Sequence, residues 1–493
     1  MAEIDANTPV LVGYGTAHQR SPDPREALDA AGLMIDATLA SVPSTLATSI
    51  LPEVDWVAAT EGLTAYPDPG RLVAEAIGAV KAHTVLAKVG VMQQTLISRA
   101  CSLVQSSDAT FALVVGGEAR YRDVLANAAG MQAQIALQSS DSQPDEVLTP
   151  ATEIVLRCEA EAGLLGAPGF YALVESAWRV RRSQSLDQQR RELGELYARF
   201  SEIATHNPAA VRRQPYDAEY LQSPSSDNPF VAFPYTKLMV TTWTVDQAAA
   251  LLFCTVGTAE RWGIPRERWL FPVVAIESNH MVPVTARKDM TQAEAVRAMA
   301  GACIRVAGVD PSAIDLLDIY SCFPVAVTVT ANGLGIPTGR DLTLTGGMSF
   351  AGGPYNNYVF QAICRAAELL ADRQGTTALV SCVSGLYTKQ GFTVLATEPP
   401  QRPFSVQDVT AEVDALEPAI PVEDCPTGPG TIAAATVLFQ DGKPERAVAV
   451  IDLPNAHRTV ARCSAPDVMT AFMTEEPIGR SVLVADGHFS FTT

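Results

Sequence analysis

The feature that most constrains the fold is an order of strands and helices that occurs twice along the chain. A buried strand, a long apolar helix and a second strand follow one another before residue 120, and the same order returns about 260 residues later. The pattern predicts two similar α/β halves, with chance likeness between α/β units as the alternative. The segments that match are VDWVAATEG with IDLLDIYSC, and SSDATFALVVGGEA with RQGTTALVSCVSG.

The predicted elements indicate the fold class. Apolar residues at three-to-four spacing predict helices at 93–105, 292–306 and 358–370. Short apolar runs between them predict strands that alternate with the helices. Because such alternation is typical of a mostly parallel sheet covered on both faces, we expect an α/β fold.

Two segments depart from this pattern. The segment at 120–234 is polar and rich in Pro and Arg, which predicts an insertion that carries helices. The other follows Pro399 and Pro400, where short β-rich runs surround the turn signal Asp441-Gly442 and predict a separate small all-β domain, barrel-like in form. The expected domains are a first half at 1–119 and 235–270, the insertion at 120–234, a second half at 271–400 and the all-β domain at 401–493.

The charge of the chain limits its partners. Its 493 residues carry a formal net charge of −19, so we do not expect it to bind nucleic acid or an anionic membrane surface, since both are polyanions. An anionic ligand would need a local basic patch. The Arg-rich run that contains Arg179, Arg181 and Arg182 is one candidate, and the alternative is a solvated helix face.

Targeting and metal signals are not found. No basic segment followed by a long apolar run stands at the N-terminus and no stretch of about 18 apolar residues occurs, so we expect no membrane span and a cytoplasmic location. The nine cysteines stand singly, without the CxxC spacing of zinc sites. We expect buried free thiols and no metal site.

Three glycine-rich corners are the candidate site. They are IYSCFP at 319–324, TGGMSFAGGPYNN at 345–357 and SCVSG at 381–385. Glycine lets the backbone approach a ligand closely, so these corners together predict a pocket wall, although each one alone is more typical of a tight turn in an α/β sheet.

Taken in order, these corners resemble the thiolase superfamily, in particular the branch of the sterol-carrier-protein thiolases and the mycobacterial thiolase-like proteins. YSCF at 320–323 stands where thiolases have NEAF or HDCF, and GGP at 352–354 stands where they have GHP. Cys382 falls on the cysteine of the CxG motif, and VDQAAALLF and LYTKQGF agree further. The resemblance covers about residues 8–400 and implies the thiolase fold, with a layered α-β-α-β-α core and a helical loop-domain insertion.

The resemblance also implies that the family's chemistry is missing. Its acyl-accepting cysteine would fall at Gly90 or Val91, and Cys101 lies about 15 Å further along the predicted helix. Gly353 replaces the GHP histidine, which removes the base. Cys322 and Cys382 remain on catalytic positions of the family, but without a partner base their thiols need not be reactive.

In the NEAF-like motif, Tyr320 and Ser321 replace the asparagine or histidine and the acidic residue. We therefore expect that the side-chain oxyanion hole is lost, while backbone N–H groups near Val91 and Ser384 still bind a thioester oxygen. The residues expected to bind the ligand are Val91, Ser321, Phe323, Gly346, Gly347, Gly352, Gly353, Pro354 and Ser384, with Arg179, Arg181 and Arg182 at its phosphates.

Three classes of function stay open. The first is a protein that binds coenzyme A or a lipid acyl-CoA as its ligand, needs no other cofactor and has no thiolase activity. The second is an enzyme, either a retro-aldol lyase of the steroid side-chain aldolase type with Tyr320 or Tyr355 as base, or an acyltransferase of altered mechanism. The third is a protein-interaction scaffold in lipid metabolism. The resemblance implies a homodimer, with a monomer as the alternative.

Overall fold

The structure, a computed structural model, describes residues 4–150, 154–337, 339–371 and 373–492. Its centre is made of two α/β halves. The first half contains β1 (Pro9–Gln19), α1 (Ala30–Ala40), α2 (Ser44–Ile50), β2 (Trp56–Thr60), α3 (Pro69–Ala76), β3 (His83–Ala87), α4 (Gln93–Gln105), β4 (Ala112–Ala119), β8 (Asp246–Thr255) and α10 (Val256–Arg261). The second half contains β9 (Phe271–Ser278), α11 (Ala293–Ala307), β10 (Leu316–Asp318), α12 (Pro324–Gly333), α13 (Tyr358–Leu370), β11 (Thr377–Ser384) and β12 (Lys389–Ala396).

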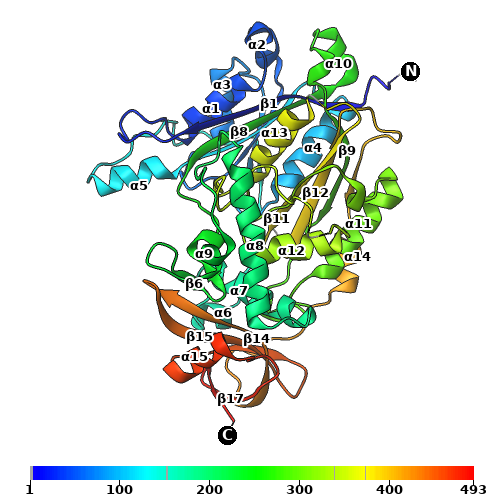
Figure 1. The fold of residues 1–493 in the computed structure, drawn as a ribbon. Coiled ribbons are helices and arrows are strands. Elements are labelled where there is room, and N and C mark those ends of the chain that lie inside the picture. Colours follow the sequence, from blue (N-terminus) through cyan, green and yellow to red (C-terminus); the bar gives the residue numbers. More distant parts are fainter. Residues whose placement is uncertain (1–3, 151–153, 338, 372, 493) are drawn as a thin grey trace.

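Two sheets enclose a layer of helices (Figure 1). Helices α4 and α13 lie between the sheets and contact strands of both, while α1 and α3 cover the outer face of the first sheet and α11 covers that of the second. In the first sheet the strand order is β1-β8-β4-β2-β3, and β5 (Glu146–Leu148) follows β3 at the edge. In the second sheet the order is β10-β11-β12-β9, and β13 (Ser405–Asp408) follows β9. The layers α-β-α-β-α that the sequence predicts are confirmed.

The inner helices fold as their sequences dictate. Both have the predicted bounds, 93–105 and 358–370. Helix α13 buries most of its residues, and the less buried Gln361, Arg365 and Glu368 stand three or four residues apart on one stripe. The side-chain oxygen Oε1 of Gln93 accepts a hydrogen bond of 2.8 Å from the backbone N–H of Val359. The first turns of α4 and α13 are therefore joined at one end of the middle layer.

The insertion is helical, as predicted. Its elements are α5 (Arg120–Ala128), β5 (Glu146–Leu148), α6 (Arg157–Glu161), α7 (Ala167–Arg181), α8 (Leu186–Thr205), α9 (Ala218–Gln222), β6 (Phe230–Ala232) and β7 (Tyr235–Thr236). Its strands do not stay within the insertion, because β5 joins the first sheet and β6 pairs with the C-terminal domain at Leu438 and Ala232.

The C-terminal domain is a closed barrel. It contains β14 (Gly428–Gln440), β15 (Lys443–Asp452), β16 (Arg458–Cys463), α15 (Pro466–Thr474), β17 (Ser481–Ala485) and β18 (His488–Phe491). Strand β14 pairs with both β15 and β17, and the ring continues through β16 and β18, which are parallel to each other. The predicted barrel-like form agrees with this ring, although helix α15 packs on the strands, so the domain is not made of strands alone.

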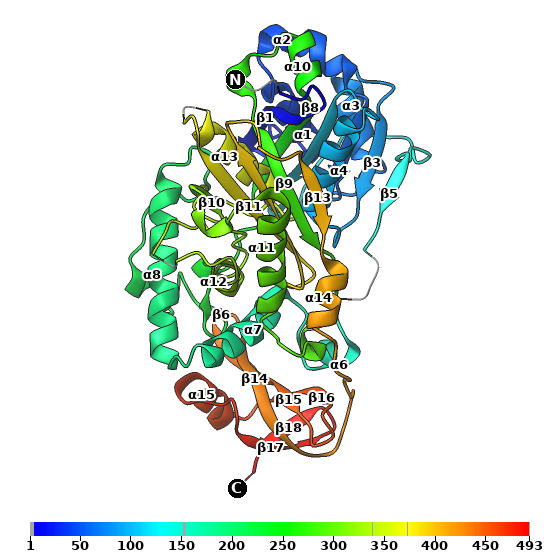
Figure 2. The same cartoon turned by 90° about the vertical axis from the view of Figure 1, so that its right-hand side faces the viewer.

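The expected domain boundary at residue 401 lies too early. Strand β13 (Ser405–Asp408) pairs in parallel with β9 and so extends the second sheet, and α14 (Thr410–Leu416) packs on α11 (Figure 2). The physical reason is that β9 would otherwise present an unpaired edge. The second half therefore continues through α14 before the barrel begins.

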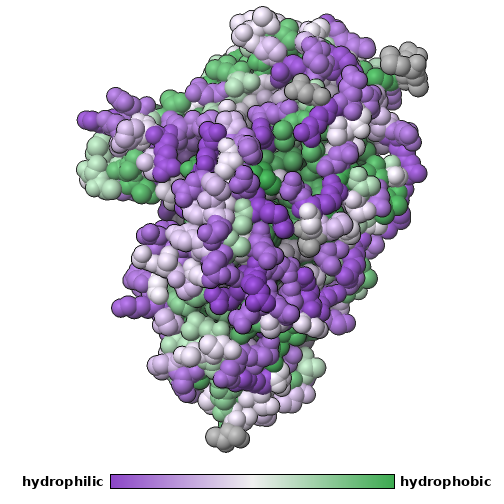
Figure 3. Space-filling model, viewed as in Figure 1, coloured by the Kyte–Doolittle hydropathy of each residue, from purple (hydrophilic) through white to green (hydrophobic). Residues whose placement is uncertain are grey.

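Most of the surface seen in Figure 3 is hydrophilic, with apolar residues in smaller patches. No helix in the described part of the chain is by itself long and apolar enough to cross a membrane. Helix α1 and the segment Ser44–Glu53 together are long and apolar enough, but the chain bends sharply between them, and this is a statement about length and composition only.

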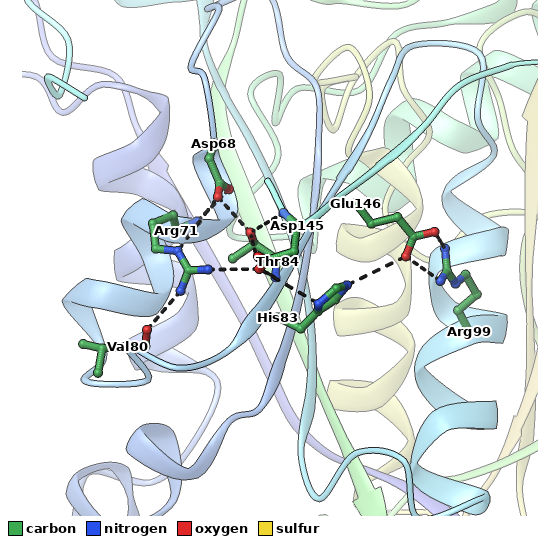
Figure 4. Close-up of polar contacts among 8 residues, drawn as sticks. All are labelled: Asp68, Arg71, Val80, His83, Thr84, Arg99, Asp145 and Glu146. Atoms are coloured by element: carbon green, nitrogen blue, oxygen red, sulfur yellow. Dashed lines mark hydrogen bonds and ion pairs between the residues drawn. The ribbon is translucent and has the colours of Figure 1, made fainter. Parts of the chain in front are cut away.

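A short segment that we call the edge strap, residues 145–148, covers the outer edge of β3 (Figure 4). The carboxylate of Asp145 accepts hydrogen bonds from the backbone N–H of Thr84 at 2.8 Å and from the guanidinium of Arg71 at 3.1 Å. Glu146 accepts two hydrogen bonds of 2.8 Å from Arg99. While the strap is in place, β3 has no free edge to offer to another chain.

We predict that the E146K variant self-associates. The new lysine would repel Arg99 instead of pairing with it. Because the Arg99–Glu146 ion pair is partly exposed, its loss removes only about 1 kcal/mol from the free energy that holds the strap. A released strap leaves the edge of β3 unpaired, so light scattering should report species larger than those of the original protein. The charge-swapped variant R99E/E146R should restore the original size, and an unchanged size of E146K would contradict the assigned role of the strap.

Candidate functional site

A cavity of about 700 Å³ lies where the inner helices begin. Its walls come from the segments that precede α4 and α13, from the turn after β11 and from the start of α7. It is lined by residues 89–93, 165–168 and 383–386, and by Tyr171, Val240, Thr241, Trp243, Tyr320, Cys322, Phe323, Met348, Gly353, Tyr355 and Asn356. None of these lining residues is a histidine or carries a formal charge, so the cavity is neutral and largely apolar.

The structure brings six of the fifteen predicted site residues to this cavity. Val91, Tyr320, Cys322, Phe323, Gly353 and Ser384 line it. Ser321, Gly346, Gly347, Gly352, Pro354 and Cys382 are not among the lining residues and lie behind the wall. The three glycine-rich corners therefore meet at one cavity, but each contributes only part of its length.

The residues behind the wall shape it. The Ser321 hydroxyl accepts a hydrogen bond of 3.0 Å from the backbone N–H of Met348, a lining residue. Gly346 and Gly347 have positive φ, and a side chain at Gly346 would collide with the backbone of Ala204 in α8. The pair thus allows α8 to approach closely instead of exposing backbone to a ligand.

The two thiols that the resemblance places on catalytic positions, Cys322 and Cys382, are buried. Burial raises the pKa of the Cys322 thiol to about 12, although a hydrogen bond with Tyr171 opposes this. Burial also raises the pKa of Cys382 to about 12, against the backbone N–H groups of Gln94 and Gln93 at the start of α4. Because the thiolate is the nucleophile, neither group is ready to react at neutral pH.

The two tyrosines considered as bases are no better placed. Burial, with the nearby Cys322, raises the pKa of Tyr320 well above that of a free phenol. Burial also raises the pKa of Tyr355, and the carboxylates of Glu118 and Glu61 add to this shift. The phenolate is the form of tyrosine that can take up a proton, so a phenol with a raised pKa provides less of this base at neutral pH.

Val91 lines the cavity as expected, but its own backbone N–H donates a 3.0 Å hydrogen bond to the carbonyl of Lys88, so a thioester oxygen would have to be bound by other N–H groups near it. The expected placement of the three arginines does not fit the structure. The arginines of the insertion do not line the cavity, because carboxylates elsewhere hold them. Arg179 pairs with Glu476, Arg181 with Asp289 and Glu294, and Arg182 with Glu192.

A cationic hollow next to the cavity was missed in the sequence. It has a volume of about 550 Å³, and Arg20, Arg212 and Lys237 line it. The hollow and the cavity share Val240, Thr241 and Trp243 as wall residues. Its three cations come from segments far apart in the sequence, so no local charge run indicated them.

Other groups adjust the charge of the hollow. The guanidinium of Arg120 stacks on the Trp243 ring at 3.8 Å. Asp246 also lines the hollow, but its carboxylate accepts hydrogen bonds from Gln19 and from the backbone of Arg122. The balance of the lining is therefore positive in a chain that is otherwise strongly acidic.

Comparison with known proteins places the fold. Residues 408–488 match the family described as "Thiolase-like protein type 1 additional C-terminal domain". The monomeric SCP2-thiolase like protein type 1 (STLP1) from Mycobacterium smegmatis is 27% identical with a TM-score of 0.84, the match covering 99% of this chain and 100% of that one. Among curated protein sequences there is no significant match.

More distant structures share the fold alone. The dimeric peroxisomal thiolase of Saccharomyces cerevisiae is 14% identical with a TM-score of 0.58, over 80% of this chain and 99% of that chain. The Ltp2-ChsH2(DUF35) aldolase is 15% identical with a TM-score of 0.56, over the same shares of the two chains. These matches and the C-terminal family confirm the resemblance to the thiolase superfamily stated from the sequence.

We predict that iodoacetamide at pH 8 modifies Cys425 first and leaves Cys322 and Cys382 untouched in the folded protein. Cys425 is exposed, whereas the other two are buried. With a pKa of about 12, only about one thiol in ten thousand is ionised at this pH. Peptide mass spectrometry with and without urea measures the difference. Modification of either buried thiol as fast as Cys425 would contradict this description of the site.

Proposed function

We propose that this chain, which has the thiolase fold and the additional C-terminal domain of the type 1 thiolase-like proteins, binds a coenzyme A thioester of a lipid acid and does not catalyse thiolysis. The observation that carries the proposal is that the apolar cavity and the cationic hollow are adjacent. A neutral apolar cavity and a cationic one share the wall formed by Val240, Thr241 and Trp243.

Each hollow matches one part of such a ligand. Cavities of about 300 to 1,000 Å³ with apolar walls are typical of small-molecule sites, so the neutral cavity suits an acyl group. Arg20, Arg212 and Lys237 suit phosphates, for which a charge-assisted hydrogen bond is stronger than a neutral one. Among the described residues, no carboxylate forms an ion pair with Arg212 or Lys237, so both side chains remain available to a ligand.

The absence of thiolysis follows from what lines the cavity. By the resemblance, Gly90 or Val91 stands where the acyl acceptor is expected and Gly353 where the histidine base is expected; all three line the cavity, and none of them can form an acyl-enzyme or move a proton. Cys322 is buried and un-ionised. A retro-aldol reaction that relies on Tyr320 or Tyr355 meets the same difficulty, because burial raises the pKa of both.

We predict that octanoyl-CoA raises the melting temperature of the protein. A ligand that binds only the folded state adds about 2.7 kcal/mol at a hundredfold excess over Kd. The R212A/K237A variant should bind octanoyl-CoA at least about tenfold more weakly, since it loses two charge-assisted contacts. Octanoate, which has no nucleotide, should raise the melting temperature of the original protein and of the R212A/K237A variant by the same amount, and by less than octanoyl-CoA raises that of the original protein.

The K443A variant serves as the matched control, because Lys443 is an exposed lysine in the C-terminal domain, away from both hollows. It should bind octanoyl-CoA as the original protein does. If millimolar CoA and octanoyl-CoA leave the melting temperature unchanged, the binding proposal is refuted and the scaffold hypothesis takes its place.

We further predict that the purified protein does not thiolyse acetoacetyl-CoA above the uncatalysed rate. The change in absorbance of the substrate with CoA added measures this directly. Typical enzymes turn over about ten times per second, so a comparable rate would show that the acyl acceptor is another residue than Val91 or its neighbour Gly90. This assay is independent of the binding experiment.

A further inference from the structure

One lysine of this chain is buried. The sequence contains six lysines, and the other five are at least partly exposed. Lys389, at the start of β12, is 4% exposed. Lysine is almost never fully buried unless a carboxylate pairs with it, because removing an ammonium group from water is costly. Its position therefore needs a reason.

Lys389 lies directly behind the cavity wall. In the antiparallel pair of β11 and β12 it stands opposite Ser384, and such cross-strand partners project from the same face of the sheet. Ser384 lines the cavity. The amine Nζ of Lys389 donates a 3.2 Å hydrogen bond to the carbonyl of Gly90, and the hydroxyl of Ser384 donates one of 3.3 Å to the same oxygen. Gly90 also lines the cavity, so two of its lining residues flank the amine.

The amine has no ionic partner. Within the described part of the chain, no carboxylate pairs with Lys389, and burial alone lowers its pKa. A desolvated lysine without a counter-charge loses its proton more readily than an exposed one, and the neutral amine is the nucleophilic form. Its hydrogen bond to the carbonyl of Gly90 does not require the charged form.

We propose that Lys389 is a reactive amine that forms an imine with a ketone or aldehyde whose apolar body occupies the cavity. Lys389 stands behind the wall at Gly90 and Ser384, none of the lining residues is itself a lysine, and the neutral walls suit an apolar carbonyl compound. The proposal rests on the cavity and not on the binding of coenzyme A.

The chemistry needs no group that the site lacks. The lone pair of neutral Nζ adds to the carbonyl carbon, one of the two Nζ protons passes to the carbonyl oxygen, and a carbinolamine forms; the second Nζ proton leaves in the next step with that oxygen. Loss of that oxygen as water then leaves a carbon-nitrogen double bond to Lys389. The hydroxyl of Ser384 shares the Gly90 acceptor with the amine and so lies close enough to supply a proton to the departing oxygen.

Reductive trapping tests the proposal. The folded protein is incubated with 2-octanone and sodium cyanoborohydride, which reduces an imine to a stable amine, and the label is located by peptide mass spectrometry. We expect one saturable adduct, with at least about tenfold more label on Lys389 than on any other lysine. The K389M and K389R variants should lose this adduct, and the K443R variant, which changes an exposed lysine, should keep it.

The outcomes separate the two proposals. Label spread over the exposed amines, with Lys389 unmodified, would overturn the imine and leave Lys389 as a structural bridge to Gly90. Far-UV circular dichroism and the melting temperature establish that each variant is folded. Because the probe has no nucleotide, a missing adduct says nothing against binding of octanoyl-CoA, and the melting-temperature titration of K389R measures that binding separately.

Discussion

The burial of two helices between two sheets is the constraint on which the rest of the structure depends. Helices α4 and α13 each bury a broad face against strands of both sheets and leave a narrow stripe less buried, and the hydrogen bond from the backbone of Val359 to the side chain of Gln93 fixes their first turns side by side. The segments that lead into them, 89–92 and 353–356, then have to meet at that end of the layer. Both segments line the cavity. The site is thus a consequence of how the middle layer is packed.

The sequence predicted the elements whose signal is local. The bounds of α4 and α13 follow from apolar periodicity, which each helix shows because it buries one broad face and keeps a less buried stripe. The corners at Tyr320, Gly353 and Ser384 could be placed at a pocket because each lies beside an element of the core. The orientation of single residues could not be predicted, since adjacent residues of a turn point in different directions. Gly346 packs against α8 for this reason, although its motif contributes to the wall.

What the sequence did not indicate depends on partners far along the chain. Strands β5, β6 and β13 are short, and each pairs with a strand of a sheet formed by distant residues. Edge pairing is decided by which backbone groups remain unpaired after folding, and a run of three or four residues has no pattern that names its partner. The net charge around the site also depends on residues far apart in the sequence. The Arg run of α7 is neutralised by Glu476 and other carboxylates, whereas the cationic hollow collects residues from three separate segments.

The barrel takes part in this arrangement through one wall of the cavity. Gly385, Leu386 and Tyr387 have φ of 59°, 56° and 77°, a left-handed turn that costs about 1 to 2 kcal/mol at each residue with a side chain. The buried guanidinium of Arg287 donates to the carbonyls of Gly385 and Leu386 at 3.3 Å and 2.7 Å, which offsets that cost. Burial lowers the pKa of Arg287 to about 10, so it stays charged at neutral pH. Arg458 of the barrel in turn donates to the backbone carbonyl of Arg287. Since Gly385 and Leu386 line the cavity, the barrel helps to hold the wall against which any ligand must pack, which gives the additional domain a physical role in the site.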